Sequence, residues 1–216
     1  MVKSILASRR LNPKSCLDLA CGNGVASVML AKQGMKVIGL DISNDMLKLS
    51  RRRAKGSHVK VDFLQGDMRS FRLPERVDMA VSLYDSLNYL LKLSDLAKCF
   101  KCVFDSLSDN GIFIFDMNTR KILENWNRWR NFSEKWNTGL VGEFDPKRNL
   151  AKLKAIMFVK RKDDDDDSYQ RFVEVHTEKA YANREIAGAL RKAGFSKVKL
   201  SEFSKGTGRL LGVASK

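Results

Sequence analysis

The sequence predicts an α/β fold with a doubly wound, seven-stranded and mostly parallel sheet, into which a small antiparallel β lid is inserted. Short apolar strands alternate with helix-period segments up to about residue 118, and the same alternation resumes after residue 181. Strands that alternate with helices favour right-handed crossovers and parallel neighbours, with helices covering both faces of the sheet. Between these two parts the spacing changes to that of antiparallel strands.

Turn and cap residues separate the elements of the first part. The glycine turn CGNG follows the first strand, Ser43 or Asn44 caps the second helix, and Asn110-Gly111 marks the end of a long helix. We expect strands over 16–20, 36–41, 59–67, 77–85 and 111–118, and helices over 25–33, 44–55 and 94–111. After residue 181 we expect a helix over 184–194 and strands over 197–203 and 209–216.

The middle of the chain is interpreted as an insertion in one domain. A Trp-rich segment over 124–136 precedes three expected antiparallel strands, over 140–144, 150–162 and 168–181. The five consecutive Asp residues 163–167 repel one another, so we expect a solvated hairpin tip there. We therefore assign residues 1–119 and 181–216 to the core and residues 120–180 to an inserted lid or substrate subdomain.

Composition narrows the class of protein. The 216 residues are 44% hydrophobic and 30% charged, as in globular proteins, and no apolar run reaches the roughly 20 residues that cross a bilayer. We therefore expect a cytoplasmic protein with no membrane partner. The net charge of +15 favours anionic partners, either nucleic acid or a small anion, although the Lys and Arg residues are spread along the whole chain. Cys99 and Cys102 fit helix packing better than a metal site, and we expect no metal.

Polar residues follow several strands of the expected sheet. Gly22 and Gly24 follow the first strand, Asp41 the second, Asp67 the third, and the pair Tyr84-Asp85 the fourth. Ligands of doubly wound folds bind at the carboxyl ends of the strands. A glycine turn before a helix lets a ligand approach the backbone, and a carboxylate at the next strand end can bind ribose hydroxyls. This pattern predicts a cofactor of the nucleoside type.

Three residues favour S-adenosylmethionine (SAM) over NAD. The nicotinamide fingerprint has a third glycine where this chain has Ser27. Asp18 within the first strand opposes a pyrophosphate but suits a cationic ligand, and Asp67 can accept a hydrogen bond from an adenine amino group.

These segments together resemble the class I SAM-dependent methyltransferases, which have a Rossmann-like fold. The resemblance rests on LDLACGNG (17–24), GLDIS (39–43), QGDMRSF (65–71), YDSLNYL (84–90), GIFIFDMNT (111–119) and the ending LLGVASK. The DSLNYL and FDMNT stretches look most like the small-molecule branch with a β-sheet lid after the fifth strand, and FVEVHTEKAY (172–181) resembles the returning strand of that lid. Two departures are Ala20, where relatives often have glycine, and the short segment of about 14 residues before the first strand.

The resemblance implies a role for each matching position. Ala20, Gly22 and Gly24 are expected to border the methionine part of SAM, with Asp18 ordering their loop. Asp41 is expected to bind the ribose, Ile42 to pack on the adenine, and Asp67 with Met68 to hold the adenine edge. Tyr84 is expected near the transferable methyl group.

Residues around the acceptor are less specific. We take Tyr84, Asp85 and His176 as candidate catalytic residues, and a simple helix cap or a packed lid residue is the alternative for the last two. Further candidates for contacts with the acceptor are Asn88, Asp116, Asn118 and Tyr181. Asp85, Asp116 and Asn118 are similar to the Mg²⁺ set of metal-dependent O-methyltransferases, but Asp116 and Asn118 are not adjacent.

The sequence thus predicts a SAM-dependent methyltransferase (EC 2.1.1.-) that moves a methyl group to an O or N atom of a small-molecule acceptor by in-line displacement. The Trp and Arg residues between positions 120 and 136 leave RNA open as a partner, either as a substrate or for a non-catalytic basic RNA-binding protein on this fold. An NAD-dependent oxidoreductase is a third alternative.

Overall fold

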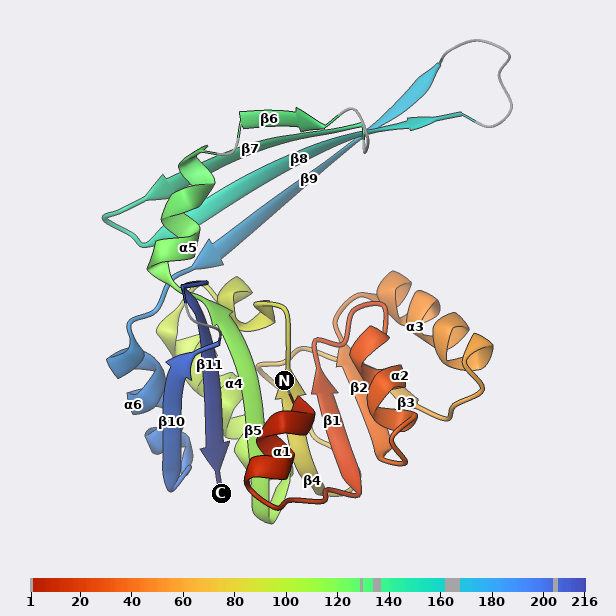
Figure 1. Ribbon diagram of the computed structural model, residues 1–216, viewed down its shortest axis with the longest axis vertical. Helices are drawn as coiled ribbons and strands as arrows, with labels where there is room; N and C mark the ends of the chain where they lie inside the picture. Colours follow the sequence, from red (N-terminus) through yellow and green to blue (C-terminus); the bar gives the residue numbers. More distant parts are fainter. Residues whose placement is uncertain (1, 129, 134–136, 162–167, 204–205) are drawn as a thin grey trace.

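Two separate β-sheets make up the protein, as the sequence predicted (Figure 1). The computed structural model describes residues 2–128, 130–133, 137–161, 168–203 and 206–216. One sheet has seven strands in the order β10-β11-β5-β4-β1-β2-β3, and the other has four in the order β6-β7-β8-β9. The predicted α/β fold class, with a mostly parallel seven-stranded sheet and an antiparallel one, is confirmed.

The seven-stranded sheet is parallel except for one strand. Strand β11 runs antiparallel to both of its neighbours, β10 and β5. The order reverses beside β1, which lies between β4 and β2, so that a crevice opens at the carboxyl ends of these strands. The strands are β1 Ser15–Leu19, β2 Lys36–Asp41, β3 Asp62–Gln65, β4 Val77–Ser82, β5 Leu107–Asn118, β10 Lys197–Glu202 and β11 Arg209–Ser215.

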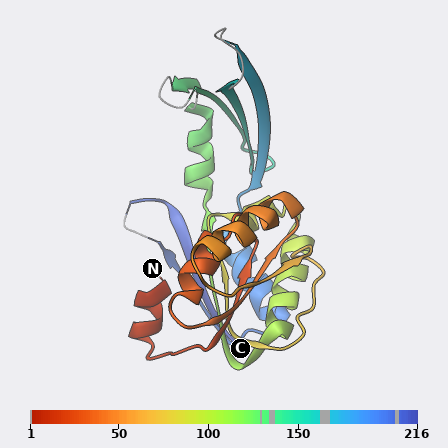
Figure 2. The same ribbon diagram turned by 90° about the vertical axis from the view of Figure 1, so that its right-hand side faces the viewer.

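Helices cover both faces of this sheet (Figure 2). Helices α4 (Leu93–Ser106) and α6 (Asn183–Ala193) pack on one face, where Phe100, Phe113 and Phe115 form a fully buried aromatic cluster. Helices α1 (Val2–Ser8) and α2 (Val25–Ala31) pack on the other face, with α3 (Asn44–Gly56) beside α2. None of the described helices is both long enough and apolar enough to span a membrane.

The end of the long helix before β5 differs from the prediction. Helix α4 ends at Ser106 and β5 begins at Leu107, whereas the sequence placed the stop at Asn110-Gly111. The strand extends because Leu107 pairs with Val77, and the register shifts before Ile112 pairs with Met79. Gly111 lies in this irregular stretch, where a Cβ would be 2.7 Å from the Cβ of Leu107. Tight packing in the strand, rather than a helix stop, therefore explains this glycine.

The second sheet is antiparallel and has one strand more than predicted. Strand β6 (Arg130–Ser133) comes from the Trp-rich segment and pairs with β7 (Thr138–Asp145). The longer strands β8 (Leu150–Lys160) and β9 (Tyr169–Lys179) pair over their whole length. The short helices α5 (Arg120–Asn125) and η2 (Trp126–Arg128) pack on this sheet through Leu123 and Trp126. The predicted tip at Asp163–Asp167 lies outside the described residues.

The second sheet stands above the carboxyl edge of the first and is joined to it by buried hydrogen bonds (Figure 1). The Asn88 amide, in the short helix η1 (Ser86–Tyr89), donates to the carbonyl oxygens of Asn118 and Lys179, both at 2.9 Å. The Tyr181 hydroxyl donates to the Leu90 carbonyl. These bonds fix the two chain crossings between the sheets. The division at residues 119/120 and 180/181 stays a prediction.

The close packing of β11 on the aromatic cluster leads to a stability prediction. A Cβ at Gly212 would lie 2.1 Å from the Phe115 ring, which is fully buried, whereas a Cβ at Gly188 in α6 would meet nothing within 4 Å. We expect Gly212→Ala to lower the free energy of unfolding by about 1–3 kcal/mol through overpacking. The control Gly188→Ala should raise it by about 0.5–1 kcal/mol. Urea denaturation of both variants measures the difference, and equal stabilities would contradict the packing argument.

Candidate functional site

The loop between β1 and α2 is held by positive-φ residues and by Asp41. Ala20, Gly22 and Gly24 have φ values of 57°, 52° and 77°. The Gly22 amide donates to Asp41 Oδ2 at 2.8 Å, and the Ser43 amide donates to Oδ1 at 2.9 Å. Each carboxylate oxygen has two lone pairs, so Asp41 can still accept two further hydrogen bonds in a fixed orientation.

Gly24 differs from Gly22 in what it contacts. A Cβ at Gly24 would lie 2.7 Å from the Cβ of Ser50, so this glycine lets α2 approach α3. A Cβ at Gly22 would meet nothing within 4 Å, which leaves its surface open. The structure therefore places Gly22 on an open surface and Gly24 in a packing contact.

Asp18 is buried and is held by the serine that departs from the nicotinamide fingerprint. Its side chain points to the α2 side of the sheet, where the Ser27 hydroxyl donates to Oδ2 at 2.5 Å. Burial raises the pKa of Asp18 to about 6, and the hydrogen bonds from Ser27 oppose that rise. The pair orders the start of α2 beneath the glycine turn.

Two adjoining cavities contain most of the predicted cofactor residues. The first, of about 460 Å³, is lined by Asp41, Ile42, Asp67 and Met68. The second, of about 310 Å³, lies at the glycine turn and is lined by Asp18, Gly22 and Tyr84. Ala20 lines both, so the two cavities meet at the end of β1. We call the first the Asp67 cavity and the second the glycine-turn cavity.

Asp67 is engaged by a residue that the sequence analysis did not consider. Arg69 Nε lies 3.0 Å from each Asp67 oxygen, and its backbone amide donates to Oδ1 at 2.8 Å. The Arg69 hydrogen bonds lower the pKa of Asp67 and keep the carboxylate charged. Arg69 also lines the Asp67 cavity, and it reaches Asp95 at 3.6 Å.

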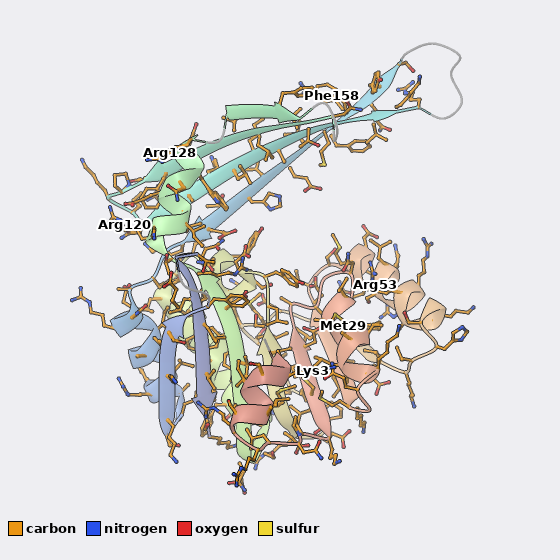
Figure 3. The ribbon with its side chains drawn as sticks, in the orientation of Figure 1. Lys3, Met29, Arg53, Arg120, Arg128 and Phe158 are labelled. Carbon is orange, nitrogen blue, oxygen red and sulfur yellow. The ribbon has the colours of Figure 1, made fainter. Side chains whose placement is uncertain are left out.

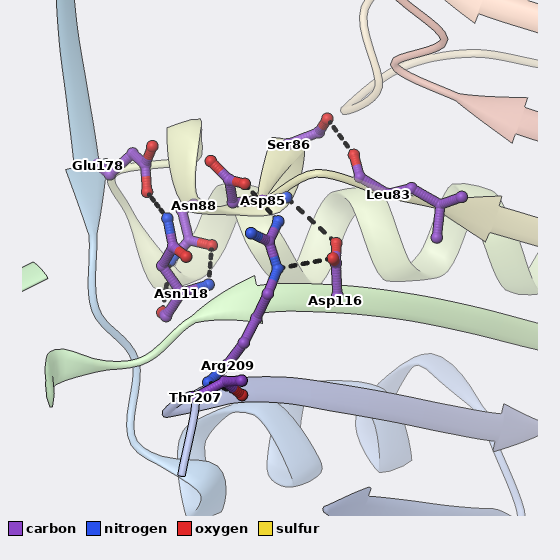
Figure 4. A network of polar contacts seen from close by, with 9 residues as sticks. All are labelled: Leu83, Asp85, Ser86, Asn88, Asp116, Asn118, Glu178, Thr207 and Arg209. Atoms are coloured by element: carbon purple, nitrogen blue, oxygen red, sulfur yellow. Dashed lines mark hydrogen bonds and ion pairs between the residues drawn. The ribbon is translucent and has the colours of Figure 1, made fainter. Parts of the chain in front are cut away.

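A strained turn after β4 directs Tyr84 into the glycine-turn cavity. Tyr84 and Asp85 both have positive φ, 59° and 55°, which costs free energy for side chains other than glycine. Asp85 is held in this conformation from two sides: its amide donates to Asp116 Oδ1 at 3.1 Å, and its carboxylate pairs with Arg209. Arg209 Nε also donates to Asp116 Oδ2 at 2.7 Å, so that the cation lies between two carboxylates (Figure 4).

Glu178, which sequence reasoning missed, is buried where β9 meets the core. The Asn118 amide donates to Glu178 Oε2 at 2.9 Å (Figure 4). Burial raises the pKa of Glu178 to about 8, and the negative charge of Asp85 adds to the rise. The only signal in the sequence was the position of Glu178 two residues after His176, on the same face of the strand.

His176 reaches the cleft through a partner on η1. The Tyr89 hydroxyl and His176 Nδ1 share a hydrogen bond at 2.8 Å, and Glu174 Oε2 lies 3.4 Å from Nε2. Burial raises the pKa of Tyr89 to about 12. Tyr89 lines the Asp67 cavity. The structure thus places His176 of the second sheet behind a residue that lines the Asp67 cavity.

The remaining candidates for contacts with the acceptor are engaged in the interior. Asn88, Asn118 and Tyr181 are buried and their polar groups bond to protein atoms. Arg209 stands between Asp85 and Asp116, where a shared Mg²⁺ would have to lie. Within the described ranges, no group of three or more His, Cys, Asp and Glu residues could hold a metal ion, and Cys99 is buried in the core.

Comparison with known proteins identifies related chains. A methyltransferase domain family matches residues 16–111. The Bacillus subtilis (strain 168) protein named "Putative methyltransferase YqeM" is 32% identical over 187 residues, which are 83% of this chain and 72% of that protein. A dTDP-3-amino-3,4,6-trideoxy-alpha-D-glucopyranose N,N-dimethyltransferase of Streptomyces venezuelae is 30% identical over 53% of this chain and 47% of its own length.

Solved structures share the fold. A SAM-dependent methyltransferase from Clostridium acetobutylicum ATCC 824 superposes with a TM-score of 0.84 at 22% identity, over 99% of this chain and 88% of that one. The SAM-bound amino pentose methyltransferase CalS10 from Micromonospora echinaspora has a TM-score of 0.69 at 21% identity, over 99% and 87% of the two chains.

The buried Glu178 leads to a prediction about pH. The native protein keeps the Glu178 proton up to about pH 8, whereas an exposed glutamate releases it near pH 4.5. Because the native state then binds more protons than the unfolded state, the free energy of unfolding falls as pH rises through this window. Between pH 6 and pH 9 the free energy of unfolding should therefore fall less in Glu178→Gln than in the wild type, by at least about 1 kcal/mol. Denaturation at a series of pH values measures it.

The matched control is Glu143→Gln, at an exposed position of β7. It should leave the pH dependence as in the wild type. Equal slopes for the wild type and Glu178→Gln would show that Glu178 is ionised in the native protein.

Proposed function

Because the chain belongs to the class I SAM-dependent methyltransferases, we propose that it methylates an O or N atom of a small-molecule acceptor at the carboxyl edge of the seven-stranded sheet. The observation that carries this proposal is the charge of the glycine-turn cavity. Among the described residues that line this cavity none is Lys or Arg, and its buried charge is the carboxylate of Asp18. A cationic ligand suits this cavity, whereas the pyrophosphate of NAD would face a carboxylate without a countercharge.

The remaining contacts fit SAM along the cleft. We assign the ribose to Asp41, whose two oxygens each keep a free lone pair beside the backbone donors of Gly22 and Ser43. Ile42 is 66% exposed at the cleft, and an adenine ring packed on it would remove this apolar side chain from water. Asp67 and Met68 lie at the same end and are assigned to the adenine edge. Ala20 lines both the Asp67 cavity and the glycine-turn cavity, so we place it beside both ends of the cofactor.

Methyl transfer demands alignment more than acid–base chemistry. When bound, SAM supplies a methyl group whose bond to the sulfonium sulfur breaks with the electron pair left on sulfur, while a lone pair of the acceptor forms the new bond to carbon. The protein residues hold the reactants in line and exclude water. We assign this positioning to Tyr84, which lines the glycine-turn cavity, and to Asp85, which with Arg209 fixes the turn that carries it.

A neutral acceptor must also lose a proton. We assign its removal to His176, acting through the Tyr89 hydroxyl with which it shares a hydrogen bond. Glu174, 3.4 Å from Nε2, stabilises the imidazolium that results. Since both His176 and Glu174 belong to β9, the segment 120–180 is proposed to act as the lid that completes the site.

Related proteins support a small-molecule acceptor. The Streptomyces venezuelae relative is named for an amino sugar nucleotide, and a Pasteurella multocida relative, 27% identical over 52% of this chain, is named a ubiquinone biosynthesis O-methyltransferase. The relative named an RNA methyltransferase matches only 27% of this chain. The net charge of +15 keeps RNA as the alternative that an acceptor screen must include.

Cofactor binding depends on Asp41 in this proposal. We expect Asp41→Ala to weaken binding of SAM and of its demethylated product by about 10- to 100-fold, the loss of one or two hydrogen bonds to a charged group. Gly22→Val, which fills the open surface at a positive φ, should have a similar effect. Calorimetric titration with both ligands and with NAD measures it, and far-ultraviolet circular dichroism checks that each variant is folded.

The matched control is Asp45→Ala, an exposed carboxylate in the first turn of α3. Its affinities should equal those of the wild type. Unchanged affinity in Asp41→Ala, or tight binding of NAD, would refute the assigned cofactor site.

The base is tested on whichever acceptor takes up label from methyl-labelled SAM in a screen of phenols, amino sugar nucleotides and RNA. We expect His176→Gln to lower kcat about 100-fold and to leave the KM for SAM unchanged. His58→Gln, at an exposed position two residues after the end of α3, changes the other histidine of the chain and should behave as the wild type. An unchanged kcat in His176→Gln would exclude this histidine as the base.

A further inference from the structure

A third cavity, of about 320 Å³, adjoins the glycine-turn cavity on the side away from Asp67. It lies where α1, α2, the end of β4 and the residue after β10 meet, and Figure 3 marks its Lys3 on α1 and its Met29 on α2. Val25, Ala26, Leu83 and Tyr84 line both cavities. A molecule bound here would therefore contact Tyr84 from one side, and the methionine end of the proposed cofactor would contact it from the other. We call this cavity the Met29 cavity.

The walls of the Met29 cavity are mostly apolar. Met29 is 59% exposed and Phe203 is 38% exposed, although both are large hydrophobic side chains. Val2, Leu30 and Leu83 complete the apolar lining. A ring placed between these side chains would remove apolar surface from water, and the unbranched methionine adapts to its shape.

One end of the cavity holds a buried hydrogen-bond acceptor. Asp116 is 5% exposed and is the one carboxylate among the described residues of this lining. It accepts from the Asp85 amide and from Arg209 Nε, which leaves a lone pair on each oxygen for a further donor. Because Arg209 already balances its charge, a neutral hydroxyl suits Asp116 better than an ammonium group.

We propose that the Met29 cavity binds the body of the methyl acceptor, and that this acceptor is an apolar aromatic ring with a hydroxyl group that donates to Asp116. This proposal rests on the proposed function and names its substrate class. The hydroxyl anchors the ring, and the accepting atom extends past Tyr84 through the glycine-turn cavity to its junction with the Asp67 cavity, which Tyr89 lines. A sugar nucleotide fits less well, because Lys3 is the one cation among the described lining residues and a diphosphate would lie among apolar side chains.

The test uses a probe with the proposed chemistry. The protein is titrated by calorimetry with 2-naphthol and with thymidine diphosphate, each in the presence of saturating demethylated SAM. We expect 2-naphthol to bind and thymidine diphosphate not to bind. Met29→Glu, which places a charge in the apolar wall, should weaken 2-naphthol at least 10-fold while affinity for demethylated SAM stays within 2-fold.

Two further variants test whether the weaker binding of 2-naphthol arises from a charge in the Met29 cavity. Leu49→Glu makes the same change at an exposed apolar residue of α3 outside the cavity and should leave 2-naphthol binding unchanged, as should the volume-conserving Met29→Leu. Equal 2-naphthol affinity in Met29→Glu and the wild type, or preferential binding of thymidine diphosphate, would overturn the proposal. Failure of demethylated SAM to bind the wild type would instead refute the proposed function, so the two failures are distinguishable.

Discussion

Three acidic side chains lie almost fully buried at the carboxyl edge of the seven-stranded sheet, and each needs a hydrogen-bond partner because water does not reach it. Asp18 is paired with the Ser27 hydroxyl, Asp116 with Arg209, and Glu178 with the Asn118 amide. These partners come from α2, β11 and β5. The positions of these three elements around the cleft are therefore tied to the hydrogen bonds that they make to the buried acidic side chains.

Asp116 holds the turn that follows β4. Its two oxygens hold the Asp85 amide and Arg209, and this keeps the residues Tyr84 and Asp85 in a conformation that ordinary side chains avoid. Tyr84 is thereby placed on the wall between the glycine-turn cavity and the Met29 cavity. A single partly buried ion-pair network thus positions the residue that both proposed ligands would share.

The second sheet is coupled to the same edge. Glu178 bonds to Asn118 at the end of β5, and His176 bonds to Tyr89 on η1. The β9 strand therefore contacts the carboxyl edge of the first sheet, although its outer part stands away from the core (Figure 1). In the proposed function one sheet binds the nucleoside cofactor while the other supplies the acid–base groups, a division that suits acceptors of different shapes on one scaffold.

By itself the sequence determined the order along the chain of the seven core strands and of the helices between them, the parallel sheet, and the positions of Ala20, Gly22, Asp41 and Asp67 at its carboxyl edge. It could do so because apolar periodicity and turn residues are local signals, and because parallel strands end at one edge. Only the tertiary structure decided that Gly24 packs on Ser50, that Arg69 binds Asp67, that Arg209 binds Asp116, and that Glu178 binds Asn118. These contacts join segments that are far apart in the sequence. Local patterns such as apolar periodicity therefore do not predict them.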